Sequence, residues 1–164
     1  MQRFFAADHR RLDALLARST ADPGRIDLAP FAEFRAGILK HIAMEEKVLF
    51  PVARRSGATQ VALTARLRVD HGAIAALLVP TPTPALVAEM LSILAPHNRR
   101  EEEMGGVYGA SDDAVGAHEA DRLLHQLRAF LDVPLKPHND RPEVFDHIKT
   151  TLDLARQQWL IENP

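Results

Sequence analysis

Histidine and glutamate side chains interrupt the apolar stripes of the sequence at positions where a helix would point into a protein core. Leaving one polar group unpaired in a core costs roughly 1–3 kcal/mol, and a buried carboxylate costs more. A group of them therefore requires a compensating partner, which a bound metal cation would supply. Imidazole together with carboxylate suits iron, manganese or zinc. Six residues have this property, and we predict that they bind metal: His9, His41, Glu45, His71, His97 and Glu101.

The order of these residues repeats along the chain. Twice, an Asp-His pair is followed by His-x-x-x-Glu-Glu, first at residues 8–9 and 41–46 and again at 70–71 and 97–102. Residues four apart lie on one face of a helix, with Cβ atoms about 5–6 Å apart, so each His-x-x-x-Glu pair can face one centre. Two such pairs and two lone histidines predict a pseudo-symmetric site of nitrogen and oxygen ligands. The alternative is a metal-free helical interaction bundle with hydrogen-bonded core histidines, and the repeat argues against it.

Four stripes with helical spacing must position these residues. The first predicts a helix over about residues 2–19, and Pro96 predicts a kink in the fourth. Breaks are expected at 22–24, 56–57, 80–84 and 105–106, where Pro and Gly gather. Low aromatic content, at 5%, also favours helix, so we predict an all-α fold, an up-down four-helix bundle. The stripes are Phe5, His9, Leu12, Leu16; Phe34, Ile38, His41, Glu45, Val48, Val52; Leu63, Leu67, His71, Ile74, Leu78; and Leu86, Met90, Leu94, His97, Glu101, Met104.

Two further amphipathic helices are predicted after residue 110, separated by a proline-rich loop at 133–142. We expect them to pack on the bundle or to form a subunit interface, for example in a homodimer. The predicted division is thus a metal-binding bundle at 1–110 and a helical extension at 111–164. The apolar residues of the two helices are Leu123, Leu127, Phe130 and Phe145, Ile148, Leu152, Ala155, Trp159.

Composition narrows the class of protein. The chain has 164 residues, 46% of them apolar, which is enough to fill one core. A net charge of −2 gives no basic field for nucleic acid, and the absence of cysteine excludes thiolate metal sites and thiol nucleophiles. No run approaches the ~20 apolar residues of a membrane span, and charge comes too early for a signal peptide. We therefore expect a cytoplasmic protein without nucleic-acid or membrane partners.

The four histidines and two glutamates resemble the pattern of the hemerythrin-like (HHE cation-binding) family over residues 2 to about 104. The segment Glu45-Glu46-Lys47-Val48-Leu49-Phe50-Pro51 fits this resemblance too. It implies a four-helix bundle that holds two non-haem irons with an oxo or hydroxo bridge and positions for an exogenous ligand. By resemblance, His9 and His71 are lone imidazole ligands, His41 and His97 are the second imidazoles, and Glu45 and Glu101 bridge both irons.

One position departs from the oxygen-carrying hemerythrins. They place a fifth histidine one turn after the third-helix ligand, where this chain has Ala75. This argues against reversible dioxygen transport, and the symmetric shell is more similar to bacterial iron-centre repair proteins, which usually carry a Cys-containing segment that this chain lacks. The resemblance implies a protein that reacts with or senses dioxygen, peroxide or nitric oxide, or that handles iron. Whether it is an enzyme stays open, and an iron-binding or iron-donating module without turnover is the alternative.

Residues beside the six predicted ligands are expected to have lesser roles. Asp8 and Asp70 point about 100° away around their helices, which predicts a surface or inter-helix role. Glu46 and Glu102 are expected on a solvated face, with orientation of a neighbouring imidazole as the alternative. Tyr108 is expected in a loop after the glycines, although a phenol on this face could ligate. We expect Met44, Met90 and Met104 in the core and His118, His125, His138 and His147 at the surface. Asp13 lies one turn beyond His9, where it could accept a hydrogen bond from near the site, but the pattern does not favour this role.

Overall fold

The fold is described from a computed structural model that gives the backbone of residues 1–162 and the side chains of residues 1–158. This part of the chain is all helical and contains no strand, as predicted. The helices are α1 (Gln2–Ser19), α2 (Leu28–Met44), α3 (Phe50–Ala53), α4 (Ala58–Leu77), α5 (Pro84–Glu102), α6 (Val107–Asp113), α7 (Ala117–Arg128) and α8 (Pro142–Glu162).

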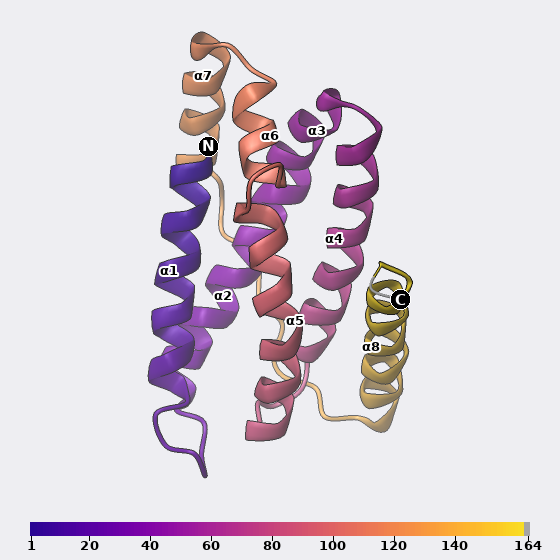
Figure 1. Cartoon of the computed structure of the whole chain (residues 1–164). Coiled ribbons are helices and arrows are strands. Elements are labelled where there is room, and N and C mark those ends of the chain that lie inside the picture. Colours follow the sequence, from indigo (N-terminus) through magenta and orange to yellow (C-terminus); the bar gives the residue numbers. More distant parts are fainter. Residues whose placement is uncertain (163–164) are drawn as a thin grey trace.

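Helices α1, α2, α4 and α5 run side by side as an up-down bundle, and α8 lies along α4 on its outer side (Figure 1). Local signals set their ends. Asp27 accepts a hydrogen bond from the backbone N–H of Ala29 and so caps α2, and Thr83 caps α5 in the same way, directly before Pro84. The four bundle helices are those that the apolar stripes predict.

The sequence pattern predicted one unbroken second helix, but this helix is not regular. A π-helical segment (Glu45–Leu49) follows α2, and the Phe50 N–H bonds to the Glu45 carbonyl five residues earlier. Pro51 has no N–H to donate and cannot continue a regular α-helix without loss. Segments of π-helix often occur at functional sites because they insert one residue and redirect its neighbours. Here the segment begins at Glu45, one of the predicted ligands.

The apolar core consists of two clusters, one toward each end of the bundle. The cluster near the N-terminal half of α1 includes Phe5, Leu49, Phe50 and Leu67. The other cluster has these buried side chains among its members: Leu12, Phe31, Phe34, Ile38, Ile74, Met90 and Leu94. The predicted metal ligands separate the two clusters as a polar layer.

The C-terminal helices contribute to both clusters. Leu123 and Leu127 of α7 join the cluster around Phe5, whereas Ile148 and Leu152 of α8 join the other. The side chain of Trp159, which was predicted on the α8 stripe, lies outside the described residues. The division at residue 110 and the homodimer stay predictions. Among the described helices, none has the length and apolarity needed to cross a membrane.

Two apolar positions do not lie where the stripes placed them. Met104 is fully exposed, so its assignment to the core was wrong. The reason is that α5 ends at Glu102, before the stripe reaches Met104. Phe145 is 43% exposed, because α8 turns Val144 and Ile148 toward the bundle instead.

Candidate metal centre

The six predicted site residues meet at the middle of the bundle. Each is buried, and they come from α1, α2, the π-helical segment, α4 and α5. Their inward-facing atoms form two groups in which all atoms lie within 4.8 Å of one another. The first group, which we call site A, contains His9, His41, Glu45 and Glu101; the second, site B, contains His71, His97, Glu45 and Glu101.

The Glu45 carboxylate lies between the two sites. Its Oε1 is 3.1 Å from Nε2 of His41 in site A. Its Oε2 is 3.2 Å from Nε2 of His71 in site B. Each oxygen of this carboxylate therefore faces one histidine pair.

Glu101 is placed in the same way on the opposite helix. Its Oε2 is 3.4 Å from Nε2 of His9 in site A, and its Oε1 is 3.1 Å from Nε2 of His97 in site B. Two carboxylates that each face both sites are what a two-metal centre with bridging carboxylates requires.

The outer nitrogen of every site histidine donates a hydrogen bond to an acid on a neighbouring helix. Asp8 accepts from His41 at 2.9 Å and Glu46 from His71 at 3.0 Å. Asp70 accepts from His97 at 3.4 Å and Glu102 from His9 at 2.6 Å. We call these four acids the carboxylate cycle, because each acid accepts a hydrogen bond from the histidine on the next helix around the bundle.

The cycle decides between the alternatives considered for these acids. The inter-helix role predicted for Asp8 and Asp70 is confirmed. Glu46 and Glu102 are partly exposed, but they also orient a neighbouring imidazole, so the preference for a merely solvated face was wrong. An acid that holds Nδ1–H fixes the tautomer and leaves the Nε2 lone pair pointing inward.

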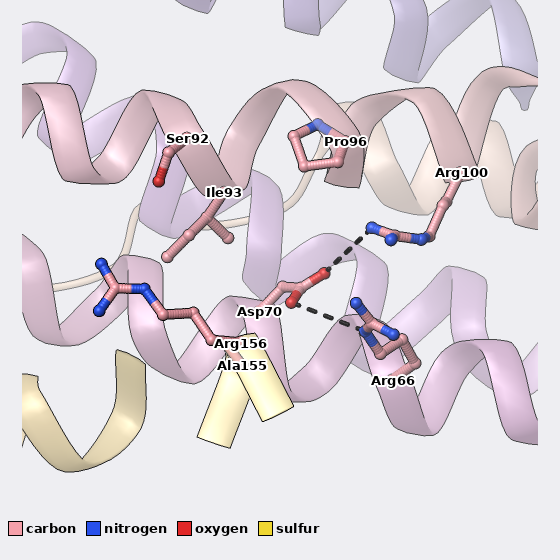
Figure 2. Close-up of a pocket in the computed structure, with 8 residues that line it drawn as sticks. All are labelled: Arg66, Asp70, Ser92, Ile93, Pro96, Arg100, Ala155 and Arg156. Atoms are coloured by element: carbon pink, nitrogen blue, oxygen red, sulfur yellow. Dashed lines mark ion pairs between the residues drawn. The ribbon is translucent and has the colours of Figure 1, made fainter. Parts of the chain in front are cut away.

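Asp70 is itself contacted by two arginines, Arg66 of its own helix α4 and Arg100 of α5. Figure 2 shows its carboxylate between Arg66 and Arg100, each with a guanidinium nitrogen 3.9 Å from one carboxylate oxygen. These residues line a cavity of about 440 Å³ that also reaches Ala155 on α8. The two guanidinium groups therefore flank the carboxylate that accepts the hydrogen bond from His97.

Comparison with known proteins identifies the family of this chain. The family model described as the hemerythrin HHE cation binding domain matches residues 1–107. The chain belongs to the hemerythrin HHE cation-binding family. No curated protein and no solved structure matches the chain. Family and clustered side chains together support a metal-binding helical protein.

The electrostatics of this hemerythrin domain favour cations at its centre. Burial opposes a charge on His41, but the carboxylates of Glu45 and Asp8 outweigh burial and raise the pKa of His41 to about 10. His97 behaves alike: burial is outweighed by Glu101 and Asp70, and its pKa rises to about 10. Burial also opposes a charged Glu45, yet the facing imidazoles hold the pKa of Glu45 well below its usual value.

Three inward-facing atoms of site B have no hydrogen-bond partner: Oε2 of Glu45, Nε2 of His71 and Oε1 of Glu101. A neutral imidazole whose Nδ1 carries the hydrogen offers only a lone pair at Nε2, which cannot bond to a carboxylate oxygen. Either a proton or a metal cation must stand between such atoms. The donor set of two imidazoles and two carboxylates fits a cation of the iron, manganese or zinc type.

Tyr108 belongs to the centre, although the sequence favoured a loop. It lies in α6, is fully buried, and directs its hydroxyl into site A. Gly105 has φ 81°, and a Cβ on Gly106 would meet backbone carbonyl oxygens at 2.6 Å, so only glycines allow the tight turn that returns the chain to the site. Seven-residue spacing from Glu101 was the available signal, and the glycines obscured it.

The remaining histidines lie away from this centre. His118, His125, His138 and His147 are exposed, as predicted. His138 contacts the backbone carbonyl of Val79 through Nδ1 at 3.3 Å. Asp13 is exposed as well, and is not among the residues of either site.

Proposed function

We propose that this chain is a hemerythrin-type protein with two non-haem iron ions that react with or sense dioxygen, peroxide or nitric oxide. The observation that carries the proposal is the placement of Glu45 and Glu101. Each directs one oxygen to a histidine pair in site A and the other oxygen to the pair in site B. A single metal would need only one oxygen of each, whereas two metals use both.

The side chains divide the work of holding the ions. His9 and His41 would hold one ion and His71 and His97 the other, while both glutamates bridge. The carboxylate cycle holds each imidazole by its outer nitrogen, which increases the basicity of Nε2 toward a metal. Bound iron would supply electrons and open positions for a small ligand.

Apolar rings exclude water from the two histidine pairs. Phe50 stacks on His71 with ring centroids 5.4 Å apart and planes inclined by 7°. Phe5 meets His41 edge-on at 5.4 Å. A dry, low-dielectric surrounding strengthens the attraction between the carboxylates and a cation, and admits small uncharged ligands more readily than ions.

Metal content per chain tests the proposal. We expect about two irons per chain after reconstitution with ferrous iron, and loss of both in the double variant His41→Ala/His97→Ala. The matched control is His125→Ala/His147→Ala, which removes two exposed histidines and should leave the metal content unchanged. No iron in the wild-type chain, with an unchanged thermal midpoint in chelator, would refute the proposal in favour of a metal-free helical bundle.

A second measurement separates reaction from storage. Iron-loaded protein is mixed with peroxide, with nitric oxide and with air, and its visible spectrum is followed. A spectral change that is reversed by removing the ligand or by adding a reductant supports reaction or sensing. Stable iron and an unchanged spectrum with all three would support the alternative, an iron-binding or iron-donating module.

A further inference from the structure

The hydroxyl of Tyr108 lies within reach of every ligand atom of site A. It is 2.6 Å from Oε1 of Glu45 and 3.1 Å from Oε2 of Glu101. It is 3.0 Å from Nε2 of His9 and 3.3 Å from Nε2 of His41. Site B has no such group among the described residues, and it is there that three ligand atoms lack a hydrogen-bond partner.

When the imidazoles are neutral, a phenol cannot satisfy this surrounding by hydrogen bonds alone. The hydroxyl carries one hydrogen, and the short contact to Glu45 indicates where it is donated. The oxygen of Glu101 also bears lone pairs, as do the two Nε2 atoms when the imidazoles are neutral. Oxygen and nitrogen lone pairs that converge on a phenol oxygen require positive charge beside that oxygen, either as protons on the imidazoles or as a bound metal cation.

The ring of Tyr108 is held so that its oxygen stays at the site. It stacks on Phe5, with centroids 5.2 Å apart and planes inclined by 23°, and it lies 5.6 Å from the His9 ring. It belongs to the apolar cluster that also contains Val107, Leu49 and Leu67. A shift of the order of one metal–oxygen bond, about 2 Å, would let a metal stand between the oxygen and the four ligand atoms.

We propose that Tyr108 is a fifth protein ligand of the metal in site A, bound through its phenolate oxygen. On binding, the phenol O–H bond breaks, the proton leaves to solvent, and an oxygen–metal bond forms without change of oxidation state. The two metals then differ: site A has five protein ligands and site B has four. An exogenous small ligand is directed to site B. This inference rests on the proposed function, because it requires metal in site A.

The composition makes the test unambiguous, because Tyr108 is the only tyrosine in the chain. The whole protein is loaded with ferrous iron and oxidised in air, which supplies dioxygen as the oxidant. We expect a phenolate-to-ferric charge-transfer band in the visible, with resonance-enhanced phenolate ring vibrations, and complete loss of both in Tyr108→Phe. This variant removes one oxygen and keeps the ring that packs on Phe5.

Metal affinity gives a second readout that does not depend on iron colour. Zinc is titrated against a competing chelator into the wild-type protein and Tyr108→Phe. We expect one of two binding steps to weaken by about tenfold or more in the variant, since even outer-shell partners contribute 10–100-fold, while the other step is unchanged. The control His147→Ala should leave both steps unchanged.

The outcomes separate this inference from the proposed function. Two irons per chain, no phenolate signal and identical zinc titrations would overturn the role of Tyr108 and leave the di-iron proposal intact. No metal in the wild-type protein would overturn both. Two irons together with a phenolate signal that Tyr108→Phe abolishes would support the ligand.

Discussion

The tight turn that returns the chain to the metal centre makes the Gly106→Ala variant informative. A Cβ at Gly106 would lie 2.6 Å from the carbonyl oxygens of Arg100 and Glu101 and 2.8 Å from that of Glu103. All three are backbone atoms, so no flexible side chain can give way. Overpacking of this kind costs about 1–3 kcal/mol, and we expect the upper half of this range because three contacts are violated together.

The matched control is Gly109, which lies three residues further on, inside the short helix α6 that Gly106 precedes. A Cβ at Gly109 meets nothing within 4 Å, and alanine in a helix is favoured over glycine by about 0.5–1 kcal/mol. Gly109→Ala should therefore stabilise the protein slightly, whereas Gly106→Ala destabilises it. The free energy of unfolding is measured by urea denaturation of both metal-free variants.

The same pair of variants tests whether the turn positions Tyr108. If Gly106→Ala displaces α6, the iron-loaded variant should lose the phenolate signal, while Gly109→Ala retains it. A Gly106→Ala protein as stable as the wild type would refute the steric reasoning. The expected loss of about 2–3 kcal/mol should also lower the thermal midpoint. At this chain length each kcal/mol corresponds to roughly 2–4 °C.

Three further predictions concern the acids, the pH and the C-terminal segment. Glu46→Gln should weaken metal binding by about 10–100-fold, because it loosens the His71 imidazole that Glu46 orients. Glu103→Gln, at an exposed position, should leave the affinity unchanged, and competition with a chelator measures both. Burial opposes a charge on His41, but Glu45 and the other facing acids raise the pKa of His41 to about 10. The protonated imidazole should therefore contribute its full share of metal-free stability below about pH 6.5, and this share should be lost as the pH rises to about 10. A free energy of urea unfolding in chelator that stays constant over this interval would contradict the prediction. Leu127→Ala should cost about 2–5 kcal/mol, since this side chain is buried in the cluster around Phe5, while exposed Leu131→Ala should change the urea midpoint little.

The sequence predicted the bundle and the meeting of the six site residues because both depend on periodicity within single helices. Apolar spacing indicated which face of each helix is buried, and the polar residues on these faces had to meet at one level. His9, His41 and Glu45 illustrate this, since each continues the stripe of its own helix and is buried. That they bind metal remains a prediction.

The residues that the sequence placed less well depend on a second element. Glu46 points away from its own stripe, and only the position of α4 shows that it reaches His71. Tyr108 depends on a turn whose path is set by a close approach of backbone atoms at Gly106. Periodicity within one helix contains neither kind of information.

The carboxylate cycle has a consequence for the smallest unit that could build this centre. Around the bundle, an acid of α1 accepts a hydrogen bond from the histidine of α2, and an acid just after α2 accepts one from the histidine of α4. An acid of α4 in turn accepts one from the histidine of α5, and an acid of α5 accepts one from the histidine of α1. The second half repeats the first, so one helical hairpin contains every kind of element the cycle uses, and two identical hairpins related by a twofold axis would close it. Joining both hairpins in one chain removes the requirement that they be identical. Tyr108, which reaches only site A, is a difference that two identical hairpins could not have.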